Sequence, residues 1–264
     1  MITKIKQFRE TIFKPHNLVG RQQELREQMY KTLGQPLLNG DLKVEPWMID
    51  LDPSRVKVRK IDGYLDCSNL GLTSLPAWFQ SIEEVTVWFD CSYNQLTSLE
   101  GSPETVGGSF DCRNNKLTSL ESSPRTVGLS FNCDNNKLTS LEGCPQTVGG
   151  SFLCYNNKLT SLEGSPQTIG WSFSCSDNQL TSLEGSPQTV GGSFYCENNR
   201  LTSLEGCPQT VGGLFYCHSN KLTSLQGLPK KIGVNLWCYK NAKQFSETDI
   251  PSDTIIGGQI KFKL

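Results

Sequence analysis

A 21-residue repeat dominates this sequence and restricts the folds open to it. Cysteine stands at the same place of nine successive phrases, separated by 24 residues once and by 21 residues thereafter: Cys67, Cys91, Cys112, Cys133, Cys154, Cys175, Cys196, Cys217 and Cys238. The later phrases read LTSLEGSPxTVGGSFxCxNNK with small changes. A phrase this short cannot bury its own apolar residues, so the phrases must stack on one another. The period therefore predicts a solenoid over residues 61–241, with nine turns.

Each phrase contains the pattern of a short strand. In "SFYCENNRL", Phe194 and Cys196 alternate with Tyr195 and Glu197, which is typical of a half-buried strand, and Asn199 ends it. The Gly and Pro of the "EGSP" type of segment then form a turn. A strand that returns in the same direction every 21 residues predicts a parallel sheet, with strands about 4.8 Å apart.

The phrases resemble the leucine-rich repeat family, in its short-period bacterial and phage form. The family signature is L-x-x-L-x-L-x-x-N-x-L, and its second half matches "FDCRNNKL", with Cys112 at a strand-leucine position and Asn115 at the asparagine position. Two departures are visible: Val106 and its equivalents lie one residue upstream of the first leucine position, and in "DCSNLGL" the asparagine is one place early. The resemblance implies an α/β solenoid: a parallel β-sheet horseshoe with a mostly irregular convex side and an N-terminal helical cap.

The repeated positions are interpreted as structural. The resemblance implies that the asparagines point inward and bond to the backbone of adjacent turns. The column of cysteines faces the core, and thiols in a line do not converge on one point as zinc ligands must. Cys144 and Cys207 replace Ser in the turn. They are three turns, or about 14 Å, apart, too far for a disulfide, and we expect them near the surface and first to react with thiol reagents.

Exposed charges also recur with the period. The glutamates and the basic residues each form a column, at Glu100, Glu121, Glu142, Glu163, Glu184 and Glu205, and at Lys116, Lys137, Lys158, Arg200 and Lys221. Like charges about 5 Å apart repel weakly in water, so a solvated surface is the interpretation. The sequence indicates no cofactor and no metal site, since it lacks a D-x-D-x-D calcium loop.

The function of a scaffold is expected where its repeats differ. The two outward columns on either side of each cysteine vary most, and we expect them on the concave side. One end carries aromatic residues, which are typical of binding hot spots: Tyr195, Tyr216, His218, Trp237 and Tyr239, with Tyr155 and Trp171 at the edge. Alternatively, the rings stack only for stability or lie under the C-terminal segment.

The other end of the same columns is acidic. It carries Asp66, Asp90 and Asp111, which could receive a basic partner or could simply be solvated. Stacked rings can also hold nucleic-acid bases, but the aromatic patch lacks accompanying Lys or Arg apart from Lys240, so nucleic acid is disfavoured. Carbohydrate is a further alternative.

The two ends differ in charge from the repeats. Residues 1–60 carry 12 Lys and Arg against 7 Asp and Glu, whereas the remainder carries 13 against 19. Helices are predicted at residues 2–13 and 20–33, and Trp47 and Met48 are expected to fill the open end of the core. The N-terminal segment is interpreted as a helical cap, or alternatively as a docking element. Residues 242–264, ending in "IIGGQIKFKL", are expected to form a final strand and a C-terminal cap.

The start "MITKIKQFRETIFKP" is not a signal peptide, because charges interrupt any apolar stretch, and no stretch approaches the roughly 18 apolar residues of a membrane span. We therefore expect a cytoplasmic protein, of the producing cell or of a host, with export without a cleaved signal left open.

The sequence predicts a non-enzymatic scaffold whose partner is a folded protein, with a bacterial effector or a phage-encoded inhibitor of a host protein as the special case. The alternative is a targeting module of a toxin or effector with enzymatic activity, because bacterial effectors of this resemblance often append a catalytic domain. No P-loop, H-E-x-x-H or G-x-S-x-G motif is present.

Overall fold

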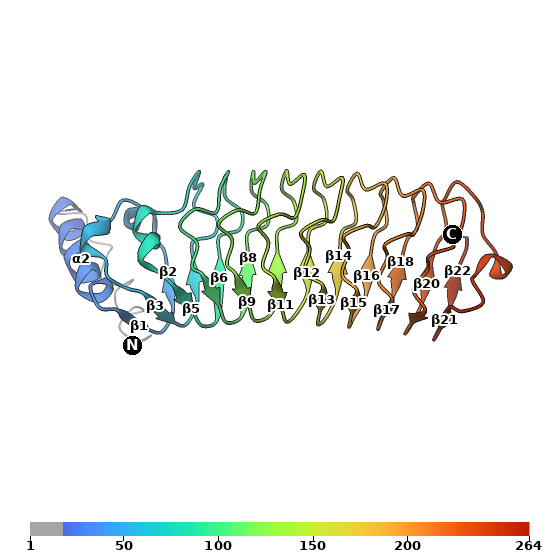
Figure 1. The fold of residues 1–264 in the computed structure, drawn as a ribbon. Coiled ribbons are helices and arrows are strands. Elements are labelled where there is room, and N and C mark those ends of the chain that lie inside the picture. The colour runs from blue at the N-terminus through green and yellow to red at the C-terminus, as the bar shows by residue number, and fades with distance from the viewer. Residues whose placement is uncertain (1–17, 264) are drawn as a thin grey trace.

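The chain folds into an elongated stack of turns, shown in Figure 1. The computed structural model describes residues 18–263, and the first predicted helix, residues 2–13, lies outside them. The second predicted helix, residues 20–33, is confirmed as part of α2 (Leu18–Leu33), which covers one end of the stack. Within residues 18–263, four short 3-10 helices occur toward the two ends: η1 (Pro46–Met48), η2 (Pro53–Arg55), η3 (Ala77–Ser81) and η4 (Glu247–Asp249).

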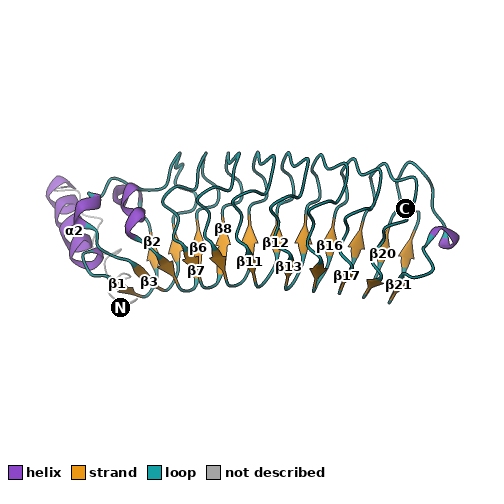
Figure 2. Cartoon of the chain, in the orientation of Figure 1, coloured by secondary structure: helices purple, strands orange, loops and turns teal. Residues whose placement is uncertain are grey.

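Each turn contributes one strand to each of two parallel sheets. The first sheet contains β1 (Leu37–Asn39), β3 (Lys60–Asp62), β5 (Glu84–Val85), β7 (Thr105–Val106), β9 (Thr126–Val127), β11 (Thr147–Val148), β13 (Thr168–Ile169), β15 (Thr189–Val190), β17 (Thr210–Val211), β19 (Lys231–Ile232) and β21 (Ile255–Ile256). The second contains β2 (Leu42–Lys43), β4 (Leu65–Asp66), β6 (Trp88–Asp90), β8 (Ser109–Asp111), β10 (Phe131–Asn132), β12 (Phe152–Leu153), β14 (Phe173–Ser174), β16 (Phe194–Tyr195), β18 (Phe215–Tyr216), β20 (Leu236–Trp237) and β22 (Ile260–Lys261). Figure 2 shows that the opposite side of the turns is loop, so the predicted solenoid with an irregular convex side is confirmed.

The sheets extend one turn beyond the predicted nine at each end. In the second sheet, Val44 follows the first strand and Phe262 follows the last strand, each in the position that cysteine occupies in the other turns. The Val44 N–H donates to Asp66 O at 2.7 Å, as the Cys67 N–H donates to Asp90 O at 2.8 Å. The sequence count missed these turns because an apolar residue of another type fills the core position. The described part of the chain thus has eleven strands in each sheet.

A column of phenylalanines runs through the core. Seven rings, from Phe89 to Phe215, stack with neighbouring centroids 5.2–5.6 Å apart, and each phenylalanine is fully buried. Aromatic pairs of this kind contribute about 0.5–1.5 kcal/mol beyond the area that they bury. The backbone of adjacent turns also approaches closely: a Cβ on Gly170 would lie 2.1 Å from Gly149 O. The repeated glycine is therefore required by the stacking distance.

The asparagines form the predicted inward ladder. Asn157 accepts from the Leu138 N–H at 3.0 Å and donates to Cys133 O and Cys154 O, each at 3.1 Å, and so connects two turns. The same pattern repeats at Asn115, Asn136, Asn178, Asn199, Asn220 and Asn241. Because these backbone groups are buried between turns, the side-chain amides satisfy donors and acceptors that water cannot reach.

The cysteines are free and buried, as Cys196 illustrates by donating from Sγ to Tyr216 O at 3.2 Å. The expectation for Cys144 and Cys207 was wrong: both are buried, and their thiols donate to Gly164 O at 3.1 Å and to Gly227 O at 2.8 Å. The Ser at this position bonds in the same way, as Ser123 does to Gly143 O. The turn is packed against the following turn, so a thiol here replaces a buried hydroxyl.

The first turns are closed by the chain before them. Met48 is buried and accepts at its carbonyl a 2.8 Å hydrogen bond from Trp78 Nε1, while Trp47 is half-buried against the same core. Arg55 holds α2 in place, since it pairs with Glu27 at 2.7 Å and lies 3.8 Å from the Tyr30 ring centroid. Trp47 and Met48 thus lie where the sequence predicted.

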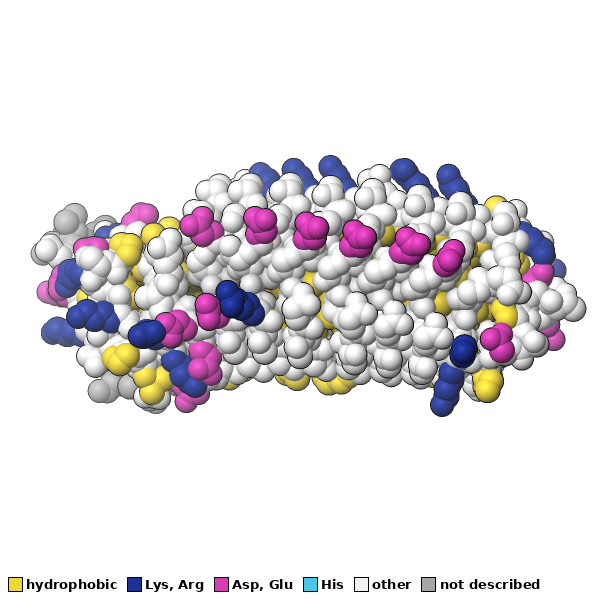
Figure 3. All heavy atoms as spheres, viewed as in Figure 1, with side chains coloured by type: hydrophobic (Ala, Val, Ile, Leu, Met, Phe, Trp, Pro, Cys, Tyr) yellow, Lys and Arg dark blue, Asp and Glu magenta, His cyan; other side chains and the backbone are white. Residues whose placement is uncertain are grey.

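The exposed glutamates and basic residues lie in two rows. Figure 3 shows the acidic row across one face and the basic row along the adjacent edge. All eleven charged side chains named for these two columns are exposed. The rows are solvated, and they lie on loops away from the strands.

Candidate functional site

The candidate site is the outward surface of the second sheet, which we call the sheet face. Phe194 and Cys196 point into the core, so the backbone alternation turns Tyr195 and Glu197 outward. The same two outward positions recur in every turn, and the parallel register places equivalent residues side by side, as Tyr195 and Tyr216 are in β16 and β18. Variation along the sequence thus becomes variation along the solenoid.

The structure brings five predicted residues together in one patch, the aromatic cluster: Tyr195, Tyr216, His218, Trp237 and Tyr239. Tyr216 stacks on Trp237 with centroids 4.4 Å apart, and His218 stacks on Tyr239 at the same distance. Tyr195 meets Tyr216 edge-on at 5.2 Å. All five side chains are half-buried. The rings thus support one another and still present part of their surface.

Cationic groups flank the cluster at the C-terminal end of the sheet. Lys261 Nζ lies 4.9 Å from the Trp237 ring centroid and 5.3 Å from that of Tyr239. Burial lowers the pKa of His218, and the charge of Lys240 adds to this. His218 is therefore favoured in its neutral form, as part of an aromatic surface.

Two other predicted residues lie apart from the cluster. None of the ring contacts within residues 18–263 involves Tyr155 or Trp171. Tyr155 instead neighbours Asp134, and its pKa is raised by burial and then by that carboxylate. Trp171 lies at the bend between the two sheets and is 57% exposed.

The three predicted aspartates at the other end accept hydrogen bonds from their own strand ends. Asp66 accepts from Ser68 Oγ at 2.7 Å and pairs with Lys43 at 3.1 Å. Burial acts to raise the pKa of Asp66, but these partners outweigh it, so the pKa is lowered. Asp90 accepts from the Ser92 N–H at 2.9 Å.

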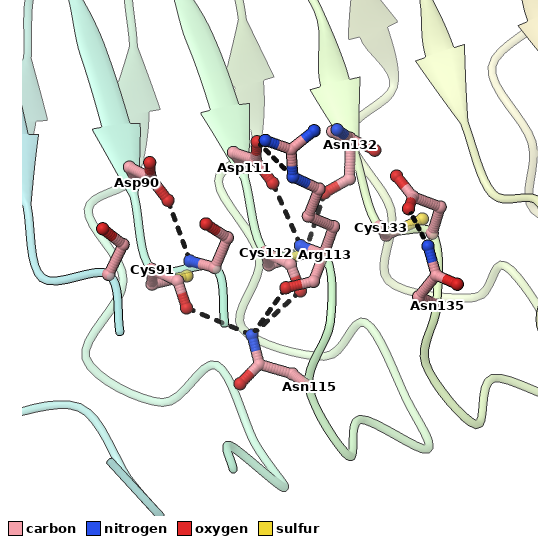
Figure 4. Close-up of polar contacts among 12 residues, drawn as sticks. Asp90, Cys91, Asp111, Cys112, Arg113, Asn115, Asn132, Cys133 and Asn135 are labelled. Atoms are coloured by element: carbon pink, nitrogen blue, oxygen red, sulfur yellow. Dashed lines mark hydrogen bonds and ion pairs between the residues drawn. The ribbon is translucent and has the colours of Figure 1, made fainter. Parts of the chain in front are cut away.

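Asp111 differs from the other two aspartates. It accepts from the Arg113 N–H at 3.1 Å, and Arg113 Nε is 3.4 Å from its other oxygen. Burial nevertheless raises the pKa of Asp111 to about 6. In Figure 4 the Arg113 guanidinium lies between Asp111 and Asn132.

Two further carboxylates of the sheet face, Asp134 and Glu197, belong to the variable outward column but were not predicted as contacts. Asp134 is fully buried and accepts from Asn135 Nδ2, and the Tyr155 side chain lies beside the same carboxylate. Glu197 has a buried Oε2 without a partner, and burial raises its pKa to about 7. The available signal was the appearance of acidic residues in the variable outward column.

The described part of the chain offers no metal centre: residues 18–263 contain no group of three or more His, Cys, Asp or Glu that could hold an ion. Burial raises the pKa of the column thiols, so they are held protonated. Within the same residues, no helix has the length and apolar character needed to cross a membrane.

The 21-residue period, the paired parallel sheets and the asparagine ladder define the class of fold: a parallel β-solenoid with repeats of the leucine-rich type. No protein-family model matches the sequence, and no curated protein matches it either.

Solved structures give three similar folds. YopM from Yersinia enterocolitica WA-314 is 22% identical over 78% of this chain and 49% of that chain, with a TM-score of 0.49. YopM of Yersinia pestis, described as a leucine-rich effector protein, is 19% identical over 89% and 75%, with a TM-score of 0.44. The functional domain of InlJ from Listeria monocytogenes, described as including a cysteine ladder, is 20% identical over 75% and 53%, with a TM-score of 0.41. The chain thus spans about half the length of the first of these.

Proposed function

We propose that the protein is a non-enzymatic scaffold that binds a folded protein partner on its sheet face, with the aromatic cluster as the main anchor. The stacking of Tyr216 on Trp237 and of His218 on Tyr239 carries this proposal. Rings held in this way lose little freedom on binding, and partly exposed Tyr and Trp are typical of residues that dominate binding energy.

The proposed binding surface extends beyond the aromatic cluster. Tyr155, Asp66, Asp90 and Asp111 share the two outward columns with the cluster and are proposed as peripheral contacts, and Trp171 as a contact at the bend. A narrower form of the proposal is that the scaffold is a bacterial effector or a phage-encoded inhibitor and that its partner belongs to a host cell. Captures from lysates of candidate hosts separate this form from the general one.

The test compares two double variants that each remove one stacked Tyr–Trp pair. Tyr216→Ala with Trp237→Ala removes the pair in the cluster, and Tyr64→Ala with Trp88→Ala removes the pair at the other end, whose centroids are 5.6 Å apart. A partner captured from lysate by the wild type and identified by mass spectrometry is then titrated against each purified variant.

We expect the cluster variant to lose affinity at least about tenfold and the control to lose little, because two hot-spot rings together contribute more than 1.4 kcal/mol. Both variants should keep the thermal transition of a folded solenoid. Equal affinities of the wild type and the cluster variant would contradict the assignment of the cluster.

A further inference from the structure

We infer that Glu197 and the adjoining rings of the aromatic cluster form a site for an arginine side chain of the partner. This inference rests on the proposed function and adds the chemical class of the group recognised. Glu197 would pair with the guanidinium, and the faces of the neighbouring rings would cover it.

The position of Glu197 supports this assignment. It follows Tyr195 on the same strand, and the register of β16 on β18 places Tyr216 and His218 beside it. On the other side lies Ser176, whose side chain is short. A carboxylate at the border of an aromatic group offers both an ion pair and ring faces, and a planar guanidinium uses both.

Unpartnered polar atoms give a second, independent observation. Within residues 18–263, five buried side-chain atoms lack a hydrogen-bond partner, and four of them lie on the sheet face. Three of these four are acceptors: Asn132 Oδ1, Asp134 Oδ1 and Glu197 Oε2. A buried acceptor without a donor costs about 1–3 kcal/mol. Asn132 and Asp134 lie three turns from Glu197, so Glu197 Oε2 is the unpartnered acceptor at the aromatic cluster, and a donor from a partner would satisfy it.

The charges on the sheet face have the matching sign. In the two outward columns of the turns from β4 to β20, the carboxylates are Asp66, Asp90, Asp111, Asp134 and Glu197, and the one Lys or Arg side chain is Arg113. Lys43 neutralises Asp66, and Arg113 lies beside Asp111. Of the remaining carboxylates, Glu197 is the one that lies at the aromatic cluster, and Lys261 and Lys240 lie at the C-terminal side of the same cluster. The match to a cation is therefore local to the Glu197 side of the cluster.

The cluster already holds one cation at its far end. Lys261 Nζ lies over Trp237 and Tyr239, which shows that these rings accept a cation of this chain within 5.3 Å of their centroids. Tyr195 and Tyr216, at the Glu197 end, have no such cation over them among the described residues. The proposed guanidinium would lie there, next to the carboxylate.

Ionisation of Glu197 sets the expected pH dependence. Burial raises its pKa to about 7, and the charge of Asp177 acts in the same direction. The titratable groups around it are Asp177, Tyr195, Tyr216, His218 and the thiols of Cys175, Cys196 and Cys217. Burial lowers the pKa of His218 and raises the pKa of the three thiols, so the neutral form of each is favoured. Because the ionised carboxylate binds the cation, affinity should rise from pH 6 to pH 8, and bound arginine should lower the pKa of Glu197.

The experiment titrates the full chain with N-acetyl-arginine amide and follows the Glu197 side-chain carboxyl and the His218 ring by NMR. The neutral isostere N-acetyl-citrulline amide controls for shape. Glu197→Gln keeps the size of the side chain and removes its charge. Glu205→Gln is the matched control, because Glu205 belongs to the same turn but lies exposed in the acidic row.

We expect arginine to shift both signals and to lower the apparent pKa of Glu197, and citrulline to do neither. Glu197→Gln should weaken binding by about fivefold or more at pH 8 and remove the pH dependence, whereas Glu205→Gln should not. Arginine binding that is equal in Glu197→Gln, or absent from this site, overturns the inference. The proposed function would survive that result, because the loss of partner affinity on removing Tyr216 and Trp237 tests it separately.

Discussion

The asparagine ladder can be tested by replacing Asn157, in the middle of the stack, with Ala. The substitution removes the acceptor of the Leu138 N–H and the donor to Cys133 O of the preceding turn, at 3.0 and 3.1 Å. Asn157 and Leu138 are both buried, at 9% and 0% exposure, so water cannot replace these bonds without opening the turn.

The expected loss of stability follows from the backbone groups that Asn157→Ala leaves without a hydrogen-bond partner. The orphaned Leu138 N–H costs about 1–3 kcal/mol, and each carbonyl that loses its amide donor adds a fraction of that amount. The free energy of unfolding should therefore fall by about 2–4 kcal/mol. Neighbouring turns are coupled in a solenoid, so the loss should weaken the contact between two turns and lower the cooperativity of unfolding.

The assay combines urea denaturation with amide hydrogen exchange at Leu138. The matched control is Asn156→Gly, the adjacent asparagine, whose φ of +52° is a conformation that glycine adopts freely. Its side chain is exposed and donates to Asn135 Oδ1, a surface hydrogen bond that water can replace. We expect the control to change the free energy of unfolding by less than about 0.5 kcal/mol. Equal stabilities of the two variants, with Leu138 exchange unchanged in Asn157→Ala, would refute the role given to the ladder.

Two further predictions concern the turns. Ser122 has φ +64° where six other turns have glycine, so Ser122→Gly should raise the free energy of unfolding by about 1 kcal/mol. Gly143→Ala, whose Cβ would lie 2.8 Å from Glu121 N, should lower it by more. Chemical denaturation checks both, and a destabilised Ser122→Gly would contradict the reasoning. Burial raises the pKa of Cys144 and of Cys207 to about 12, so iodoacetamide should label neither of them in the native protein. In denaturant it should label all eleven cysteines. Mass spectrometry locates the label, and native labelling of Cys144 would contradict the prediction by showing that the turn opens.

The fold was predictable because every turn must bury the same apolar positions against its neighbours. Phe194, Cys196 and Asn199 recur with a constant spacing, and a constant spacing can be satisfied at every turn only by stacking in register. The terminal turns were missed because Val44 and Phe262 replace the cysteine while keeping its place in the core. The repeat was traced by its cysteines, whereas the core accepts any apolar side chain of suitable size at that position.

The error at Cys144 and Cys207 has a related cause. A Ser or Cys next to a Gly and a Pro has the composition of an exposed turn, and the sequence shows no partner for it. The partner is the carbonyl of a glycine in the following turn, Gly164 for Cys144. Such a contact depends on how closely two turns approach, which composition does not reveal.

The candidate site was predictable in its position and not in its chemistry. Register alone places Tyr216 beside Trp237, because both occupy the same place in consecutive phrases. The pKa of Glu197 depends on how deeply the neighbouring side chains bury its carboxyl group. That burial depends on ring orientations, which the sequence does not determine. Ring stacking in the cluster and the unpaired Glu197 Oε2 both arise from side chains crowded at the strand spacing of about 4.8 Å. The same crowding that orders the rings excludes water from the Glu197 carboxylate. A partner that supplies a cation would therefore provide the hydrogen-bond donor that water cannot.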